Sequence, residues 1–104
     1  MIARGDVADA EIPGAGRHPV VVVSRDTAIP MLSSVVCVLV TSSFHGHVAE
    51  VELGPEEGLH HDSAASCDHV FTLSKAILSP PRGHLGPAKL AELDGALSIA
   101  LGLA

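Results

Sequence analysis

Arg17 and His18 stand directly before residues 19–23, an apolar stretch with four consecutive valines. An arginine can contact a phosphate group, and a histidine can exchange protons near neutral pH. Both follow a glycine-containing loop and precede Pro19, a residue that can open a strand but not lie inside one. A mobile loop beside a rigid strand is a suitable place for binding and proton transfer. The same pattern also fits the solvated end of a strand.

Seven histidines also suggest metal binding. His45 and His47 form one pair, and His60 and His61 form another beside Asp62. Neither pair has the spacing of a CxxC or HExxH motif, and both fall in expected loops. We therefore expect no metal site and no cofactor.

The elements that must position these residues are mostly strands. Residues 21–23 and 35–40 are continuously apolar, which is typical of central strands buried on both faces. The other expected strands are 6–11 with one solvated face, 47–53 half exposed, 63–73 as one or two strands, and 82–85. A short helical turn is expected at 27–29, disturbed by the proline after it. The one clear helix begins at Gly86-Pro87, with leucines at 90, 93 and 97 and then Ala100 or Leu101 forming a stripe for core packing.

This order of elements predicts a mainly β fold, a small antiparallel barrel or curled sheet closed by a C-terminal helix. A length of 104 residues indicates one domain, and 47% hydrophobic with 17% charged residues excludes disorder. No apolar run is long enough to cross a bilayer and no signal peptide is visible, so we expect a cytoplasmic protein without membrane contact.

The net charge and the two cysteines further limit the kinds of protein that the chain can be. Twelve acidic and six basic residues give a net charge of −6, which argues against broad, non-specific binding of nucleic acid. Cys37 lies inside an apolar run, which favours a buried thiol over a disulfide with Cys67. A short, apolar chain also favours a dimer that hides part of its surface.

Several segments carry a resemblance to a known family. They are Arg4-Gly5-Asp6-Val7, Pro19-Val20-Val21-Val22, Val38-Leu39-Val40-Thr41-Ser42, Glu50-Val51-Glu52-Leu53, Ser66-Cys67-Asp68-His69-Val70-Phe71-Thr72-Leu73 and Gly83-His84-Leu85. In this order and spacing the chain resembles, nearly end to end, the MazF/PemK toxins of bacterial type II toxin–antitoxin systems. The resemblance implies a single domain over residues 1–104, an SH3-like barrel of the MazF/PemK (Kid/CcdB-like) type with a C-terminal helix.

The resemblance also implies a function. Such toxins work as homodimers that cleave single-stranded RNA at short sequences without a metal ion or other cofactor. A cognate, MazE-like antitoxin would block the RNA groove with an extended, acidic segment, and DNA would be contacted only indirectly through that antitoxin. The reaction needs a base for the 2′-hydroxyl, a donor or cation for the charged phosphorane and an acid for the leaving 5′-oxygen.

Site residues follow from the matched motifs. Thr41 matches the family's threonine after the second central strand, Asp68 matches an acid beside the groove, and His18 occupies the place of an arginine before the proline. We expect these three to be catalytic, with His18 and Thr41 on one groove wall. RNA-binding residues are expected to be Arg17, Ser42, Ser43 and His69.

Two departures from the family pattern leave an alternative open. Ala8 and Asp9 stand where the family carries aromatic residues, and histidine binds a phosphorane less well than the arginine that it replaces at position 18. His18→Arg is therefore expected to raise activity. The alternative is a catalytically weak or inactive paralogue that acts as a dimeric, antitoxin-binding module.

Overall fold

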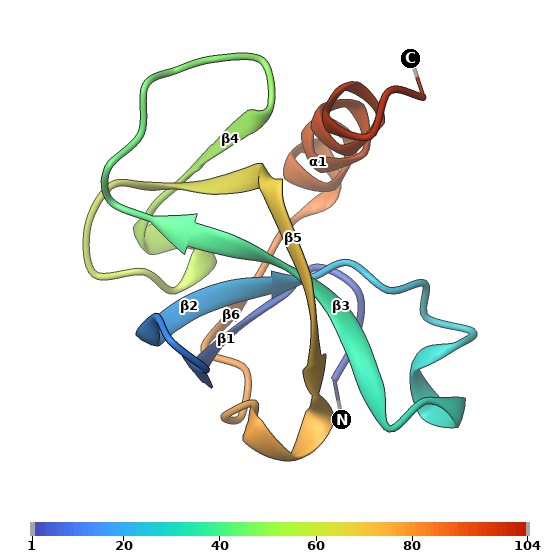
Figure 1. The fold of residues 1–104 in the computed structure, drawn as a ribbon. Helices are drawn as coiled ribbons and strands as arrows, with labels where there is room; N and C mark the ends of the chain where they lie inside the picture. The colour runs from blue at the N-terminus through green and yellow to red at the C-terminus, as the bar shows by residue number, and fades with distance from the viewer. Residues whose placement is uncertain (1, 104) are drawn as a thin grey trace.

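Six antiparallel strands form one strongly curled sheet in the order β4-β5-β3-β2-β1-β6 (Figure 1). The computed structural model describes residues 2–103. The strands are β1 (Asp6–Ile12), β2 (Gly16–Val22), β3 (Ser34–Thr41), β4 (Glu50–Leu53), β5 (Ser63–Ser74) and β6 (Gly83–His84). Helix α1 (Pro87–Ala100) ends the fold, and three short 3-10 turns lie at Ile29–Met31, Pro55–Glu57 and Lys75–Ile77. The predicted mainly β architecture with a terminal helix is confirmed.

The valines of β2 and β3 hold the centre of the sheet because both faces of these strands are covered. Val21 and Val38, which are register partners, lie in one apolar cluster beneath α1. Val20 and Val22 point the other way, into a second cluster that includes Cys37. All five side chains have no exposed surface. Burying a valine contributes about 1.5–3 kcal/mol, so this pair of strands is the rigid part from which the sheet ends extend.

Strand β5 is a single bent strand that pairs with β3 on both sides of its bend and with β4 at its start. Its register with β3 shifts between Val38, which pairs with Val70, and Leu39, which pairs with Ser66. The three residues between these partners, 67–69, therefore have no counterpart on β3. Such an irregularity bends a strand and turns its side chains in a new direction.

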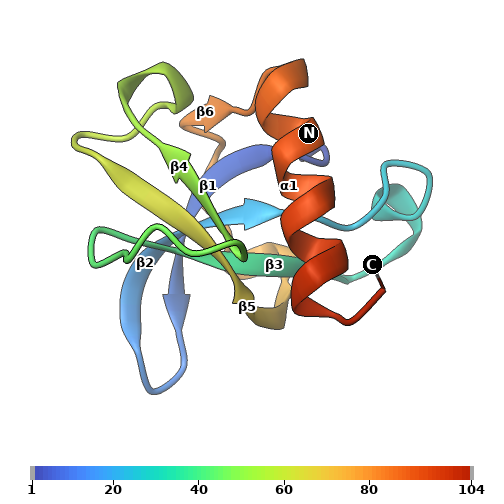
Figure 2. The same cartoon turned by 90° about the horizontal axis from the view of Figure 1, so that it is seen from above.

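Helix α1 covers β4 and β5, as Figure 2 shows, while the hairpin between β1 and β2 extends away from it. Pro87 stands at its first position, where its missing N–H is no loss. Leu93 and Ala96 are buried, and Leu90 and Leu97 pack beside them. The predicted apolar stripe is thus confirmed, with Ala100 packing at its last position and Leu101 55% exposed.

The two sheet edges meet through the turn Pro55–Glu57 and β6. Arg82 N–H donates to Val7 O at 2.8 Å, and Leu85 N–H donates to Gly5 O at 2.9 Å, which fixes the last strand against β1. A Cβ on Gly83 would lie 1.9 Å from Glu57 O. Only glycine allows the two backbones to cross this closely.

The structure corrects four expected details. Pro19 lies inside β2 rather than opening it, at a position where β2 is paired with β1 but not with β3, so that it has an edge position, which tolerates proline. Strand β1 has no solvated face along its first half, because Asp6, Val7 and Ala8 are all buried. Strand β4 begins at Glu50 rather than at residue 47. The turn near residue 28 is Ile29–Met31, and Pro30 lies inside it rather than breaking it, since a 3-10 turn tolerates proline near its start.

Two further observations bear on the chemistry of the chain. Cys37 and Cys67 are buried free thiols, as expected. Among residues 2–103, no helix is both long and apolar enough to cross a lipid bilayer.

Candidate functional site

His18 and Thr41 line one pocket of about 180 Å³. The expectation that the two residues share a groove wall is therefore confirmed. The other lining residues are Pro19, Val40, Ser42, Leu59, His60, His61, Ser63 and Arg82. The pocket thus collects three imidazoles, three hydroxyl groups and one guanidinium from four separate segments of the chain.

Strand register explains why His18 and Thr41 meet. Strands β2 and β3 pair antiparallel, with Val20 opposite Leu39. Continuing this register by two residues along each strand sets position 18 opposite position 41. Side chains two residues apart on a strand share a face, so both residues extend from the same end of the buried strand pair.

The imidazole of His18 is held by the hairpin before it. Its Nε2 lies 2.9 Å from Ala15 O. A carbonyl oxygen can only accept a hydrogen bond, so Nε2 carries a proton in this arrangement. In the neutral ring, Nδ1 is then the nitrogen with a free lone pair, and it can accept a proton.

Thr41 is oriented by the loop that follows it. Its Oγ1 accepts a hydrogen bond from Ser43 N–H at 3.1 Å, which leaves the hydroxyl hydrogen available to donate. Ser42 lines the pocket, and both serines are exposed. Ser43 thus supports Thr41 through its backbone, while Ser42 adds a hydroxyl to the pocket.

Arg82 is a pocket residue that the sequence reasoning missed. Its Nε donates to Gly58 O at 2.9 Å, and its Nη1 donates to Asp9 Oδ1 at 2.9 Å. Arg17 lies on the other side of the same carboxylate, with Nη2 3.6 Å from Asp9 Oδ2. No local sequence motif identifies Arg82 as a site residue. It comes to lie beside β2 only because the sheet closes through β6.

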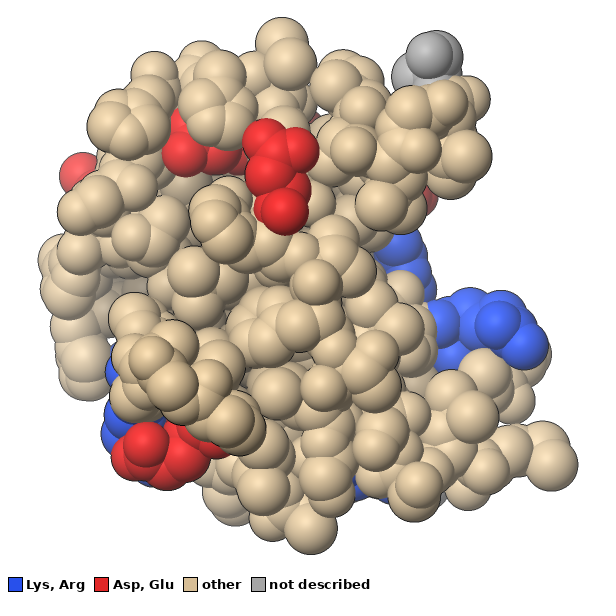
Figure 3. All heavy atoms as spheres, in the orientation of Figure 1, with Lys and Arg blue, Asp and Glu red and all other residues tan. Residues whose placement is uncertain are grey.

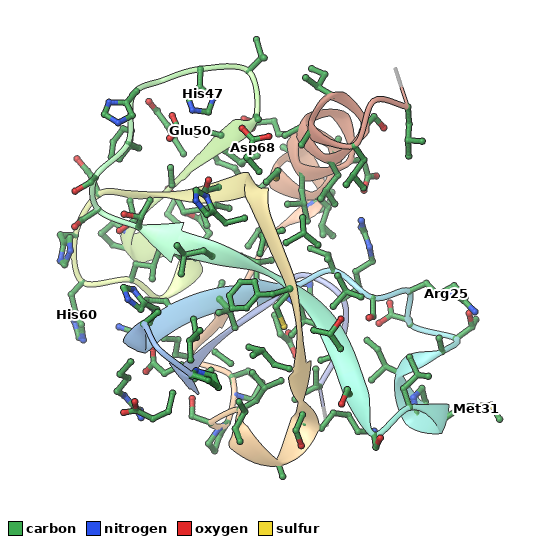
Figure 4. All side chains as sticks on the ribbon, in the orientation of Figure 1. Arg25, Met31, His47, Glu50, His60 and Asp68 are labelled. Atoms are coloured by element: carbon green, nitrogen blue, oxygen red, sulfur yellow. The ribbon has the colours of Figure 1, made fainter. Side chains whose placement is uncertain are left out.

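Asp68 and His69 lie outside this pocket. They line a second, more apolar hollow of about 350 Å³ with Leu39 and Phe71. Figure 4 shows Asp68 at the bend of β5 near α1, and His60 at the far side of the molecule. The expected place of Asp68 beside His18 and Thr41 is not found within the chain, because both Asp68 and His69 belong to the unpaired residues of the β5 bend.

The first histidine pair is organised by a carboxylate. Glu50 Oε1 accepts hydrogen bonds from the backbone N–H groups of His45, Gly46 and His47 at 2.9, 2.7 and 3.2 Å. Burial works to raise the pKa of Glu50, but these three donors outweigh it and the pKa lies below its ordinary value. Within residues 2–103, no three histidine, cysteine, aspartate or glutamate side chains gather closely enough to hold a metal ion.

The charges are unevenly spread over the face drawn in Figure 3. Most of that face shows uncharged side chains, with acidic groups toward its top, basic groups toward its right side, and groups of both signs at its lower left edge. Exposed apolar side chains on the molecule include Val48, Val70 and Ile99.

Comparison with known proteins identifies the family. The sequence profile described as "PemK-like, MazF-like toxin of type II toxin-antitoxin system" matches residues 3–101. The chain is 36% identical over 100 residues to a probable endoribonuclease, MazF5, of Mycobacterium tuberculosis, which covers 95% of this chain and 92% of that protein.

Solved structures agree with the sequence match. The Mycobacterium tuberculosis toxin MazF-mt6 superposes with a TM-score of 0.88 at 25% identity, covering 95% of this chain and 98% of that one. A mycobacterial endoribonuclease in complex with its cognate antitoxin superposes with a TM-score of 0.90 at 29% identity, covering 100% and 98%. The chain whose β2 and β3 ends form the pocket described above belongs to the PemK-like, MazF-like toxins of type II toxin–antitoxin systems.

Proposed function

We propose that this toxin is a metal-independent endoribonuclease that cleaves single-stranded RNA in the pocket between His18 and Thr41. The observation that carries the proposal is that these two residues share one pocket. A proton acceptor and a hydroxyl donor then stand at the same phosphate, as transesterification of RNA requires. The relatives that are named endoribonucleases support the same reaction class.

The residues that line the pocket can serve each step of RNA transesterification. His18 Nδ1 takes the proton of the 2′-hydroxyl, and the 2′-oxygen forms a bond to phosphorus. Thr41 donates a hydrogen bond to a non-bridging oxygen as charge develops there. The bond from phosphorus to the 5′-oxygen breaks, and His60 or His61, which line the same pocket, protonates that oxygen. The products are a 2′,3′-cyclic phosphate and a 5′-hydroxyl end.

The remaining expected residues are proposed to bind RNA around this centre. Ser42 and Ser43 offer their hydroxyl groups to the next phosphate, and Arg17, whose side chain is 59% exposed, is free to reach the backbone of the RNA strand. The apolar hollow beside Phe71 is suited to a base, because aromatic side chains stack on unpaired bases. We assign His69 and Asp68 to that base rather than to the phosphate.

The partners follow from the family. We propose that the toxin forms a homodimer and that an extended, acidic, MazE-like antitoxin segment occupies the pocket and its basic rim. DNA is then contacted only through the antitoxin. The mainly uncharged face of Figure 3 offers a surface for such assembly, and one of the similar structures is a complex with a cognate antitoxin.

The test combines growth and RNA ends. Expression of the wild-type chain should arrest growth, and sequencing should find new 5′-hydroxyl ends at recurring short sequences. Thr41→Val removes the hydroxyl with little change in shape and should lower the cleavage rate on the order of 10²-fold. Thr41→Ser keeps the hydroxyl and should stay near the wild type.

Thr72→Val is the matched control, since Thr72 is an exposed threonine of β5 whose register partner is Val36. It should change neither growth nor cleavage. Equal activity of Thr41→Val and wild type would exclude the assigned role. A wild-type chain that binds its antitoxin and never cuts RNA would instead establish the second candidate, an inactive binding module, which His18 in place of an arginine favours.

A further inference from the structure

Among the residues that the structure describes, 2–103, Arg82 is the only one lining the His18–Thr41 pocket that is charged at every physiological pH, and none of those lining it is acidic. This balance is the reverse of the whole chain, which has twice as many acidic as basic residues. A pocket that is locally cationic within an acidic protein is suited to one anionic group rather than to non-specific binding.

The guanidinium of Arg82 is held in place by two different segments. Nε donates to Gly58 O and Nη1 donates to Asp9 Oδ1, both at 2.9 Å. Two such bonds fix the plane of the rigid guanidinium fork. They use two of its five N–H groups, so both hydrogens of Nη2 and one of Nη1 remain for a ligand. The side chain is only 22% exposed, which strengthens its electrostatic interactions.

Asp9 holds Arg82 without cancelling the positive charge of the region. The same carboxylate also lies 3.6 Å from Arg17 Nη2, so one negative charge is shared by two guanidinium groups. Asp9 is itself anchored, because its backbone N–H donates to Ser79 Oγ at 2.9 Å. A fixed carboxylate behind an arginine directs the free edge of the fork away from itself.

We propose that Arg82 is the phosphate-binding cation of this site and that Asp9 is its positioning residue. The free edge of the guanidinium donates to a non-bridging oxygen of the phosphate between His18 and Thr41, and Arg82 keeps its protons throughout. The inference rests on the proposed function and deepens it. It also explains how a histidine can stand before the proline: the cation comes from the segment before β6, and position 18 is left for proton transfer.

The test uses four variants, Arg82→Gln, Arg82→Lys, Arg82→Ala and Asp9→Asn. The control is Arg25→Gln, which removes an exposed arginine on the opposite side of the view in Figure 4 from the pocket residue His60. Steady-state cleavage of an oligonucleotide carrying a mapped site gives kcat and KM, and single-turnover cleavage of the same oligonucleotide gives the rate of the chemical step. Arg82→Gln should lower kcat on the order of 10²-fold, with a smaller change in KM, because the contact strengthens as charge develops on the phosphorane. Arg82→Lys should recover part of the loss, and Arg25→Gln should match the wild type.

Two readouts separate catalysis from a structural role. Guanidinium ion at low millimolar concentration should raise the rate of Arg82→Ala and not that of wild type. Asp9→Asn should lower kcat about tenfold while leaving KM close to wild type, because it loosens the fork without removing it. Thermal unfolding of every variant reports whether the loss of the bond to Gly58 has damaged the fold. Arg82→Lys, which can still donate to Gly58 O, decides the matter if Arg82→Gln does not fold.

A measurement of oligonucleotide binding tests the role of Arg82 separately from the proposed nuclease activity. The probe is the same oligonucleotide with 2′-deoxyribose at the cleaved position, or a mixed-sequence single-stranded oligodeoxyribonucleotide if the wild-type chain cuts nothing. If wild type fails to cut but Arg82→Gln weakens binding several-fold, the nuclease proposal fails and the phosphate-binding role of Arg82 stands. Folded Arg82→Gln and Arg82→Lys proteins that cut and bind like wild type would overturn the inference.

Discussion

Gly83→Ala tests the closure of the curled sheet, where β6 crosses the turn Pro55–Glu57. The added Cβ would lie 1.9 Å from Glu57 O, 2.4 Å from Glu57 C and 2.9 Å from Gly58 N. All three are backbone atoms, so no side chain can rotate away. The two segments must separate by about 1.6 Å before the nearest contact reaches the 3.5 Å of ordinary packing.

The cost follows from what that separation disrupts. Overpacking of a tight contact costs about 1–3 kcal/mol, and loss of the hydrogen bond from Arg82 to Gly58 O adds about 1 kcal/mol. We therefore expect Gly83→Ala to lower the free energy of unfolding by about 2–4 kcal/mol. For a domain of this length that is a fall in Tm on the order of 10–30 °C.

Differential scanning calorimetry at one protein concentration measures this change. Gly95→Ala is the matched control, because Gly95 lies in α1 with no atom within 4 Å of the added Cβ. Alanine is the better helix former by about 1 kcal/mol, so the control should raise Tm. If Gly83→Ala melted with the wild type, the close crossing of the two backbones would be refuted.

Two further predictions concern the site and its loop. The family pattern alone predicts that His18→Arg raises activity. With Arg82 already supplying a cation, we instead expect this variant to lower the cleavage rate by at least about tenfold, because the proton acceptor is lost. A faster variant in the single-turnover assay would contradict this. Glu50→Gln should speed amide hydrogen exchange at residues 45–47, whose N–H groups Glu50 accepts, while Glu52→Gln on the exposed face of β4 should not. Since the pKa of Glu50 is lowered in the folded chain, its stabilisation of the loop should be complete above its ordinary pKa of 4.5 and lost as pH falls through the lowered value, and exchange protection that does not change in acid would count against this.

The two central strands and the helix could be predicted because the local signals agree with the tertiary environment. Residues 21–23 and 35–40 have no polar face, and the two strands that they form are covered on both sides. Antiparallel pairing of these neighbouring strands then brings position 18 to position 41. The expectation about His18 and Thr41 needed only this one pairing to be correct.

The features that the sequence analysis missed depend on contacts between distant parts of the chain. Asp68 was expected at the groove because it matches an acid of the family pattern, but the register shift of β5 turns it away, and no turn residue marks that shift. Asp6 was expected on a solvated face, yet it is buried because it accepts hydrogen bonds from Ala3 N–H and from His84, a residue 78 positions later. Arg82 enters the pocket only through the closure of the sheet. Each miss is a pairing between segments far apart in the sequence.

Cys37 and Cys67, which lie on the paired strands β3 and β5, are the only sulfhydryl groups of the chain. Neither has exposed surface, and burial raises the pKa of Cys37 to about 12. Burial and, after it, the neighbouring charge of Asp68 raise that of Cys67 to about 11. Because the thiolate is the reactive form, alkylating reagents should modify these thiols only when the strands part. The two native thiols should therefore not react during site-directed labelling of the folded protein. A single cysteine introduced at the rim of the His18–Thr41 pocket would take up a fluorophore alone and would report whether nucleic acid or antitoxin arrives there.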